Sequence, residues 1–337
     1  MPGRPFRPAW WLPGPHLQTL WPYLFSPRRR LALRRERLEL PDGDFLDLDW
    51  TPPLPGPLVL VLHGLEGSSE SGYIRRLTPV LAAHGMQSAI LHFRGCSGEP
   101  NRLPRAYHAG ETQDLARVIR HLRMRQPTRP LGAIGFSLGG NVLLKWLGES
   151  ASDSPLTAAA AVSVPFDLQA AAARLERGAS RIYQSYLLRP LRRAQIRKHK
   201  LRGIPPPVAR DTLARLRTLR EFDDRITAPL HGFAGVEDYY RRSSSRPWLH
   251  RIETPTLIVQ ARDDPFLLPH GIPGADELSA AVRLELTDTG GHVGFVSGPM
   301  PGLSRPWLES RLAAWLEAHC VSEVRRGDTS APPQSEA

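Results

Sequence analysis

Short apolar runs alternate with amphipathic segments over the first half of the chain. Buried strands are predicted at Pro57–Leu62, Gln87–Phe93, Pro130–Ile134 and Ala158–Val164. Between these runs apolar residues recur at helical spacing, which predicts helices over Ser71–His84 and Glu111–Arg125. Because parallel strands are buried on both faces and are joined by crossover helices, this alternation predicts a mainly parallel sheet with helices on both sides.

Other segments extend or interrupt this pattern. Further strands are expected near 37–41, 45–50, 256–261 and 283–287, and a closing helix is expected over 305–319. From about residue 165 to residue 251 the alternation stops, and helical, arginine-rich segments take over. We therefore expect an α/β domain over 37–319 that carries a helical cap insertion over 165–251. The flanking segments are expected to be an N-terminal arm (1–36), packed on the core through Trp10, Trp11, Trp21 and Phe25, and a disordered tail (320–337).

The sequence Gly135-Phe-Ser137-Leu-Gly139 lies between a predicted strand and a predicted helix. The two glycines lack a Cβ, so strand and helix can approach closely around a serine whose backbone is strained. This geometry, a nucleophile elbow, holds the serine oxygen out of the sheet where a base and a carbonyl carbon both reach it. Ser137 is therefore the predicted nucleophile.

An upstream strand leads into His63-Gly-Leu-Glu-Gly67, a variant of the turn that supplies an oxyanion hole beside such an elbow. The predicted donors are the backbone N–H groups of Leu65 and Leu138. His63 precedes Gly64 directly, so we expect it to have a structural role in the turn.

Two downstream strands end in polar segments that supply an acid and a base. The first ends in Arg262-Asp-Asp-Pro-Phe266, where we assign the acid to Asp264 and keep Asp263 as the alternative. The second leads to Gly290-Gly-His292, where His292 is the predicted base. The chain order Ser, Asp, His is that of the α/β-hydrolases and differs from the orders in chymotrypsin and subtilisin.

These three side chains have complementary chemical roles. A serine hydroxyl is a poor nucleophile at neutral pH and needs an adjacent base, here His292, to take its proton during attack. The base later returns the proton to the leaving group, and the acid fixes the histidine tautomer and stabilises the imidazolium. The residues by themselves predict acyl transfer to water through an acyl-enzyme intermediate.

Several segments together resemble the YheT-type hydrolases, bacterial relatives of the eukaryotic abhydrolase-domain membrane esterases. They extend from about residue 9 to residue 318, and the string Arg94-Gly-Cys-Ser-Gly-Glu-Pro-Asn101 is the most particular of them. The others are His16–Leu20, His63–Gly67, His92–Phe93, Gly135–Asn141, Glu221–Asp224, Asp238–Arg241, Asp263–Phe266 and Gly290–Phe295. The resemblance implies an α/β-hydrolase fold and hydrolysis of carboxylic esters, either short-chain acyl esters or acylglycerols.

Composition narrows the protein class. A chain of 337 residues with 41% apolar content can bury a large core. Two cysteines, Cys96 and Cys320, argue against a disulfide framework and indicate a reducing compartment. No apolar run approaches the ~20 residues that span a bilayer, and Met1–Pro15 lacks the continuous apolar stretch of a signal peptide. We therefore expect a cytoplasmic protein.

The net charge of +11 and the pI of about 10.4 raise the question of an anionic partner. Six arginines fall within Arg28–Arg37, and a second basic run spans Arg189–Arg202. Since nearly all the charge is arginine and no nucleic-acid-binding motif accompanies it, we expect no nucleic-acid partner. Solvated surface is the first interpretation, and weak attraction to an anionic membrane surface is the alternative.

No cofactor and no metal ion are expected, because the chain has neither H-E-x-x-H nor a cysteine pair. The aspartates at 42, 44, 47 and 49 alternate with apolar residues, which suits the polar face of a strand better than a calcium loop. Cys96 has no dedicated base in the sequence and is expected to be structural.

The favoured function is that of a serine esterase acting on a small-molecule ester. A thioesterase or amidase would use the same triad, whereas a non-catalytic scaffold that binds a membrane or a partner has no chemical need for it. Dehalogenases and many epoxide hydrolases are disfavoured, because they place Asp at the elbow apex. The oligomeric state is not predicted. Candidates to line an acyl pocket are the cap residues Tyr183, Tyr186, Leu187, Tyr239 and Tyr240, of which we expect about two to touch substrate and the others to pack the cap on the core.

Overall fold

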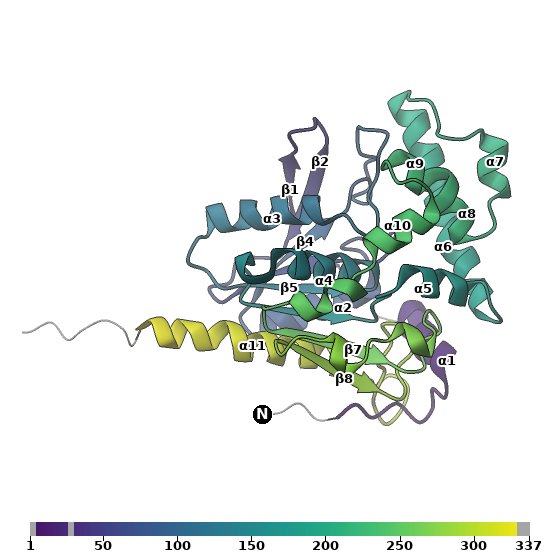
Figure 1. Ribbon diagram of the computed structural model, residues 1–337. Helices are drawn as coiled ribbons and strands as arrows, with labels where there is room; N and C mark the ends of the chain where they lie inside the picture. Colours follow the sequence, from purple (N-terminus) through teal and green to yellow (C-terminus); the bar gives the residue numbers. More distant parts are fainter. Residues whose placement is uncertain (1–4, 26–29, 329–337) are drawn as a thin grey trace, which may run out of the picture.

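The computed structural model describes residues 5–25 and 30–328. Eight strands form one sheet in the order β1-β2-β4-β3-β5-β6-β7-β8 (Figure 1). Their bounds are β1 Arg34–Glu39, β2 Phe45–Trp50, β3 Leu58–Leu62, β4 Gln87–His92, β5 Leu131–Phe136, β6 Ala158–Val162, β7 Thr256–Ala261 and β8 Val282–Thr287. The β3–β8 strands are parallel, while β2 pairs antiparallel with both β1 and β4. The predicted mainly parallel sheet is confirmed.

Helices cover both faces of this sheet, because its central strands are apolar on both faces. In β3, Leu58, Leu60 and Leu62 belong to the core on one side, while Val59 and Val61 belong to the core on the other. The first core also contains side chains of α3 and α4, and the second contains side chains of α2 and α11. The bounds of these helices are α2 Gly72–Ala83, α3 Thr112–Arg125, α4 Leu138–Ser150 and α11 Trp307–Asp328.

The edge strand β1 begins at Arg34, within the segment that was expected to belong to the arm. All six of its residues pair antiparallel with β2, and cross-strand ion pairs add to this pairing. Arg35 Nε lies 2.7 Å from Asp49 Oδ1, and Arg37 Nε lies 2.8 Å from Asp47 Oδ1. Both aspartates are buried, so part of the first basic run is neutralised at the edge of the sheet.

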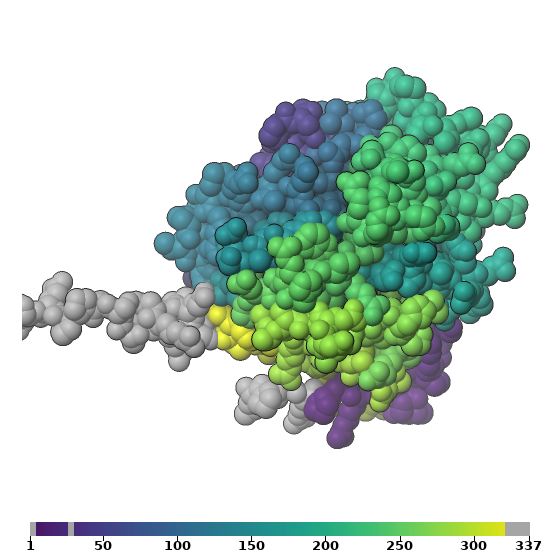
Figure 2. Space-filling view, viewed as in Figure 1, coloured from purple at the N-terminus to yellow at the C-terminus, as the bar shows by residue number. Residues whose placement is uncertain are grey.

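The helical cap lies between β6 and β7 and forms a lobe over the sheet (Figure 2, green). It contains α5 Leu168–Leu175, α6 Ser180–Arg202, α7 Arg210–Arg215, α8 Leu219–Phe222, the π-helical turn η2 Asp223–Thr227, α9 Ala228–Leu230, α10 Val236–Ser243 and the 3₁₀ turn η3 Arg246–Arg251. A small apolar cluster of its own, which includes Leu188, Leu213 and Phe222, holds α6, α7 and α8 together.

The N-terminal arm carries the helix α1 (Pro15–Phe25). Gln18 of α1 is buried, accepts the backbone N–H of Val296 at 2.8 Å, and donates to the Val296 carbonyl at 3.2 Å. Two aromatics are less buried than expected: Trp10 is 79% exposed, although its indole N–H donates to the Pro299 carbonyl at 2.8 Å, and Phe25 is 62% exposed. Phe25 falls on the same helical face as Gln18 and Pro22, but it is the last residue of α1, and its ring packs on Trp21 of the same helix with centroids 4.3 Å apart.

At the other end of the chain, α11 continues past Cys320 to Asp328, within the segment expected to be a disordered tail. The rest of that segment, 329–337, lies outside the described residues. Over the described part of the chain, no helix combines the length and the apolar character needed to cross a bilayer.

Candidate active site

Ser137 stands at the turn between β5 and α4 in a strained backbone conformation, with φ +50° and ψ −118°. The flanking glycines leave room for this turn. A Cβ on Gly135 would lie 2.5 Å from the carbonyl oxygen of Gly139, and a Cβ on Gly139 would lie 2.5 Å from that of His63. Any larger residue at either position would therefore push strand and helix apart.

The structure brings Ser137, His292 and Asp264 together. Ser137 Oγ lies 3.0 Å from His292 Nε2, and His292 Nδ1 lies 2.8 Å from Asp264 Oδ2. Because a carboxylate can only accept, Nδ1 carries the proton, and Nε2 is free to accept the serine hydroxyl. The alternative acid, Asp263, instead accepts the backbone N–H of Gly291 at 2.9 Å and does not contact the imidazole.

Residues without an assigned role in the sequence hold this arrangement in place. The Phe266 ring stacks on the His292 imidazole, with centroids 3.9 Å apart and planes 5° apart. Asp264 accepts the Phe266 backbone N–H at 2.8 Å and the Gln260 side-chain amide at 3.2 Å. Thr19 Oγ1 accepts the His292 backbone N–H at 2.9 Å. Phe266 and Thr19 fall within recognisable motifs, yet nothing local in sequence points them at His292.

Two tyrosines fix the loop that follows β3. The backbone N–H of Gly64 donates to Tyr73 Oη at 2.8 Å, and that of Glu66 donates to Tyr107 Oη at 2.7 Å. The N–H of Leu65, between them, has no hydrogen-bond partner among the described residues. Glu66 has φ +52°, so the loop turns sharply at this point.

The second predicted donor, Leu138, is the first residue of α4. Its N–H is therefore one of the amides at a helix N-terminus that lack an intrahelical acceptor, at the positive end of the helix dipole. The loop also borders the nucleophile, since a Cβ on Gly64 would lie 3.3 Å from the Ser137 Cβ. Leu138 follows Ser137 in the chain, and Leu65 lines the same cavity as Ser137.

His63 is fully buried and structural. Its Nε2 accepts the backbone N–H of Phe93 at 3.2 Å, so its Nδ1 carries the proton and donates to the Gly64 carbonyl at 2.7 Å. Burial lowers the pKa of His63 to about 3, which keeps the ring neutral. The ring therefore braces the loop rather than acting as a base.

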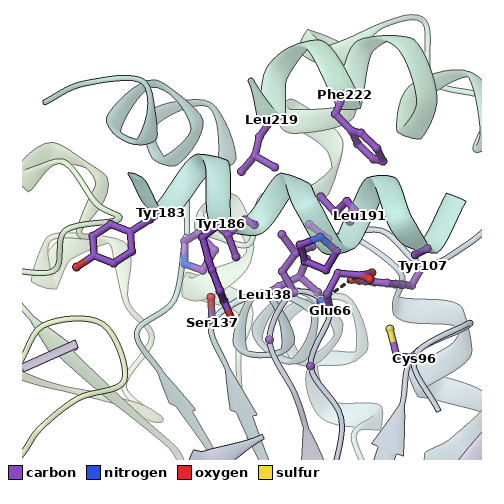
Figure 3. A pocket seen from close by; sticks show the side chains of 18 of the residues that line it. Glu66, Cys96, Tyr107, Ser137, Leu138, Tyr183, Tyr186, Leu191, Leu219 and Phe222 are labelled. Carbon is purple, nitrogen blue, oxygen red and sulfur yellow. Dashed lines mark hydrogen bonds between the residues drawn. The ribbon is translucent and has the colours of Figure 1, made fainter. Parts of the chain in front are cut away.

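A cavity of about 990 Å³ lies over Ser137 and beneath the cap (Figure 3). In this view Tyr183 of α6 lies to one side of Ser137, Tyr186 lies above it, and Leu191 and Phe222 lie to the other side. The side of Tyr183 is also the side of the base His292, because the Tyr183 ring packs on Phe266 and the Phe266 ring stacks on His292. All five cap residues named as candidates line this cavity, namely Tyr183, Tyr186, Leu187, Tyr239 and Tyr240.

Two polar side chains, Glu66 and Tyr107, border the side of the cavity that Leu191 and Phe222 line. The hydroxyl of Tyr107 donates to Glu66 Oε1 at 2.8 Å, and Cys96 lies beside them (Figure 3). Burial raises the pKa of the Glu66 carboxyl and raises that of the Cys96 thiol well above its ordinary value. Cys96 therefore stays a thiol, which fits a structural role. Within residues 5–25 and 30–328, no cluster of His, Cys, Asp and Glu could hold a metal ion.

Comparison with known sequences matches residues 57–299 to the alpha/beta hydrolase fold family. The chain is 44% identical over 308 residues to YheT of Escherichia coli, with 90% of each chain covered. It is 31% identical over 306 residues to the human phospholipase ABHD3, covering 88% of this chain and 75% of the relative. It is 32% identical over 271 residues to the monoacylglycerol lipase of Saccharomyces cerevisiae, covering 77% of this chain and 59% of the relative.

Among solved structures, the esterase Pf2001 of Pyrococcus furiosus superposes with a TM-score of 0.57 at 17% identity. The match covers 86% of this chain and 94% of that protein. At this identity the likeness concerns the fold alone.

Proposed function

The chain belongs to the α/β-hydrolase family, as its resemblance to the YheT-type hydrolases predicted, and on this premise we propose that it hydrolyses carboxylic esters through Ser137. The observation that carries the proposal is the hydrogen-bonded series from Ser137 Oγ to His292 Nε2 (3.0 Å) and from His292 Nδ1 to Asp264 Oδ2 (2.8 Å). Each contact has the length and polarity that a nucleophile, a base and its orienting acid need.

In the proposed acylation step, Ser137 Oγ attacks the ester carbonyl carbon while His292 Nε2 takes its proton. The carbonyl oxygen becomes an oxyanion and accepts hydrogen bonds from the N–H groups of Leu65 and Leu138. Asp264 stabilises the imidazolium through Nδ1. The intermediate collapses when His292 gives its proton to the leaving alcohol oxygen, and this leaves an acyl ester on Ser137.

In deacylation the same groups act on water. His292 Nε2 removes a proton from a water molecule, whose oxygen attacks the acyl carbon. The second oxyanion occupies the same pair of N–H donors. Its collapse returns the proton from His292 to Ser137 Oγ, releases the carboxylic acid and restores the starting state.

The shape of the cavity supports a substrate with a sizeable acyl chain. The leaving alcohol must lie near His292, which protonates it, so the acyl chain extends to the opposite side of Ser137. That side is lined by Leu138, Leu191 and Phe222 (Figure 3). A cavity of about 990 Å³ is at the upper end of the usual range for small-molecule sites. Acyl esters and acylglycerols fit this description, and two relatives are named as a lipase and a phospholipase.

The test is hydrolysis of nitrophenyl esters of increasing acyl length, together with monoacylglycerols, alongside labelling by a fluorophosphonate. We expect Ser137→Ala to abolish labelling and to lower turnover by roughly 10⁴-fold to 10⁶-fold with the fold intact. Ser185→Ala, an exposed serine of α6, is the matched control. Labelling that survives in Ser137→Ala would move the nucleophile elsewhere. Faster cleavage of thioesters or amides would reassign the substrate class, and no turnover at all would favour a non-catalytic scaffold.

A further inference from the structure

Two helices meet at the mouth of the cavity, α1 of the arm and α6 of the cap (Figure 1). The hydroxyl of Tyr186 donates to that of Tyr23 at 2.6 Å, and their rings pack edge to face with centroids 5.5 Å apart. A second contact joins His16 Nδ1 to Tyr183 Oη at 3.0 Å. The two helices therefore form one continuous surface around the opening.

This surface is unusually apolar. Seven of the twelve large apolar or aromatic side chains exposed in the described part of the chain lie on α1 and the first half of α6. On α1, Leu17, Leu20 and Leu24 recur at helical spacing on one face, and Leu24 is 61% exposed. On α6, Ile182 is 72% exposed. The full set is Leu17, Leu20, Tyr23, Leu24, Phe25, Ile182 and Tyr186, and we call it the mouth patch.

Cations extend the mouth patch along α6. Arg189 and Arg193 follow Ile182 at seven and eleven residues, so they continue the same exposed stripe of the helix, and Arg181 stands beside it. Among the described residues, no carboxylate forms an ion pair with these three arginines. Arg35 and Arg37 of the first basic run, by contrast, are paired with aspartates. Unpaired positive charge is therefore placed next to exposed apolar side chains.

The combination identifies the partner by its chemistry. An apolar strip flanked by arginines suits an anionic lipid surface, where the apolar side chains enter the acyl region and the cations meet the headgroups. The patch is also continuous with the cavity, because Leu20, Tyr23 and Ile182 belong to both. A protein bound at this place would close the opening, whereas a lipid surface leaves it open to lipid molecules.

We propose that the mouth patch, together with Arg181, Arg189 and Arg193, docks this protein on an anionic lipid surface with the cavity opening toward the lipid. Acyl chains then pass from the surface into the cavity without crossing water. This second statement rests on the proposed function, whereas the docking itself does not.

The docking is tested by sedimentation with vesicles, using Ser137→Ala protein so that no lipid is consumed. We expect binding to vesicles of equimolar phosphatidylcholine and phosphatidylglycerol, weak binding to phosphatidylcholine alone, and a steep loss between low and physiological salt. The double variant Leu17→Ser/Leu24→Ser and the double variant Arg181→Glu/Arg189→Glu should each weaken binding by about tenfold or more. None of these four residues lines the cavity.

Matched controls come from α3, which lies on the opposite side of the molecule from α1 (Figure 1). Met124 is 70% exposed and Arg120 is exposed. Met124→Ser therefore removes an exposed apolar side chain, and Arg120→Glu reverses an exposed positive charge, both away from the mouth patch. We expect both to bind vesicles like the parent protein. Equal binding to neutral and anionic vesicles at low salt, or equal losses in the control variants, would overturn the proposal.

Sedimentation velocity gives a third result that would overturn the proposal. If the parent protein is a dimer and the mouth-patch variants are monomers, the occupant of the patch is a second copy of this chain.

Measurements of ester cleavage separate the docking proposal from the proposed function. With Ser137 present and no vesicles, the two double variants should cleave a soluble short-chain nitrophenyl ester at the parent rate. Intact vesicle binding without any ester cleavage would refute the proposed function and leave the docking in place.

Discussion

The hydroxyl of Tyr107 accepts the backbone N–H of Glu66 at 2.7 Å and donates to the carboxyl oxygen of the same residue at 2.8 Å. On the other side of Leu65, Tyr73 Oη accepts the backbone N–H of Gly64. Tyr73 lies in α2 and Tyr107 in the segment before α3, so the loop is held from two separate elements. The direction of the Leu65 N–H is therefore set by tyrosine side chains that lie outside the loop.

Removing one of these hydroxyls should weaken catalysis more than binding. Tyr107→Phe is expected to lower kcat by roughly tenfold to a hundredfold with little change in KM, because a misplaced oxyanion donor acts mainly on the transition state. Tyr73→Phe should behave in the same way. The measurement is steady-state kinetics, with active sites counted by fluorophosphonate titration. A lower Tm with unchanged kcat per titrated site would mean that the hydroxyls only stabilise the fold.

The two neighbouring carboxyls should differ sharply. Asp264→Asn is expected to lower kcat by about 10⁴-fold, because an amide beside Nδ1 supports the wrong imidazole tautomer. Asp263→Asn keeps an oxygen that can accept the Gly291 N–H, so its effect on kcat should be far smaller. Kinetics of both variants on one nitrophenyl ester decide this. Reversed sensitivities would move the acid to Asp263 and leave the rest of the mechanism in place.

Filling the apolar side of the cavity should shorten the preferred acyl chain. Leu191 lines that side, whereas Leu201 on the same helix is exposed and serves as the control. Leu191→Trp is expected to lower kcat/KM for long-chain esters by roughly tenfold or more relative to short-chain ones, since each lost methylene contact is worth about 1–3 kcal/mol. Leu201→Trp should leave the chain-length profile unchanged. A uniform loss over all lengths in Leu191→Trp would show that the acyl chain lies elsewhere.

The buried His63 should make the protein less stable in acid. Its pKa is lowered to about 3 in the folded protein by burial, while in the unfolded chain it is near 6.5. Between these values only the unfolded chain binds the proton. The free energy of unfolding therefore rises with pH across this window, by up to about 1.4 kcal/mol per pH unit, and this contribution is constant above it.

Urea denaturation near pH 5 and near pH 7.5 measures this dependence. His63→Gln should be less stable than the parent at both values, because it disturbs the contacts to Gly64 and Phe93. The loss of stability on acidification should, however, be smaller in the variant. An equal loss in both proteins would assign the acid sensitivity to other groups.

Several features could be predicted from the sequence because they depend on a few neighbouring residues. The elbow needs two glycines around Ser137, and their positions are explicit in the chain. The apolar run of β3 indicates a strand buried on both faces, and its side chains do divide between two cores. The start of β1 was misplaced, because the cross-strand pairs of Arg35 and Arg37 depend on residues of another strand.

The sequence by itself determined the α/β alternation, the order of the three candidate triad residues and the place of the cap, since each follows from local backbone preference or hydrophobic period. Only the tertiary structure decided which of two adjacent carboxyls faces His292, and that Thr19, 273 positions away in the chain, holds the His292 backbone. It also decided that Arg35 and Arg37 pair with aspartates at the edge of the sheet, while Arg181, Arg189 and Arg193 have no carboxylate partner among the described residues. These outcomes depend on contacts between distant segments, and such contacts are set by how whole elements pack rather than by the residues around them.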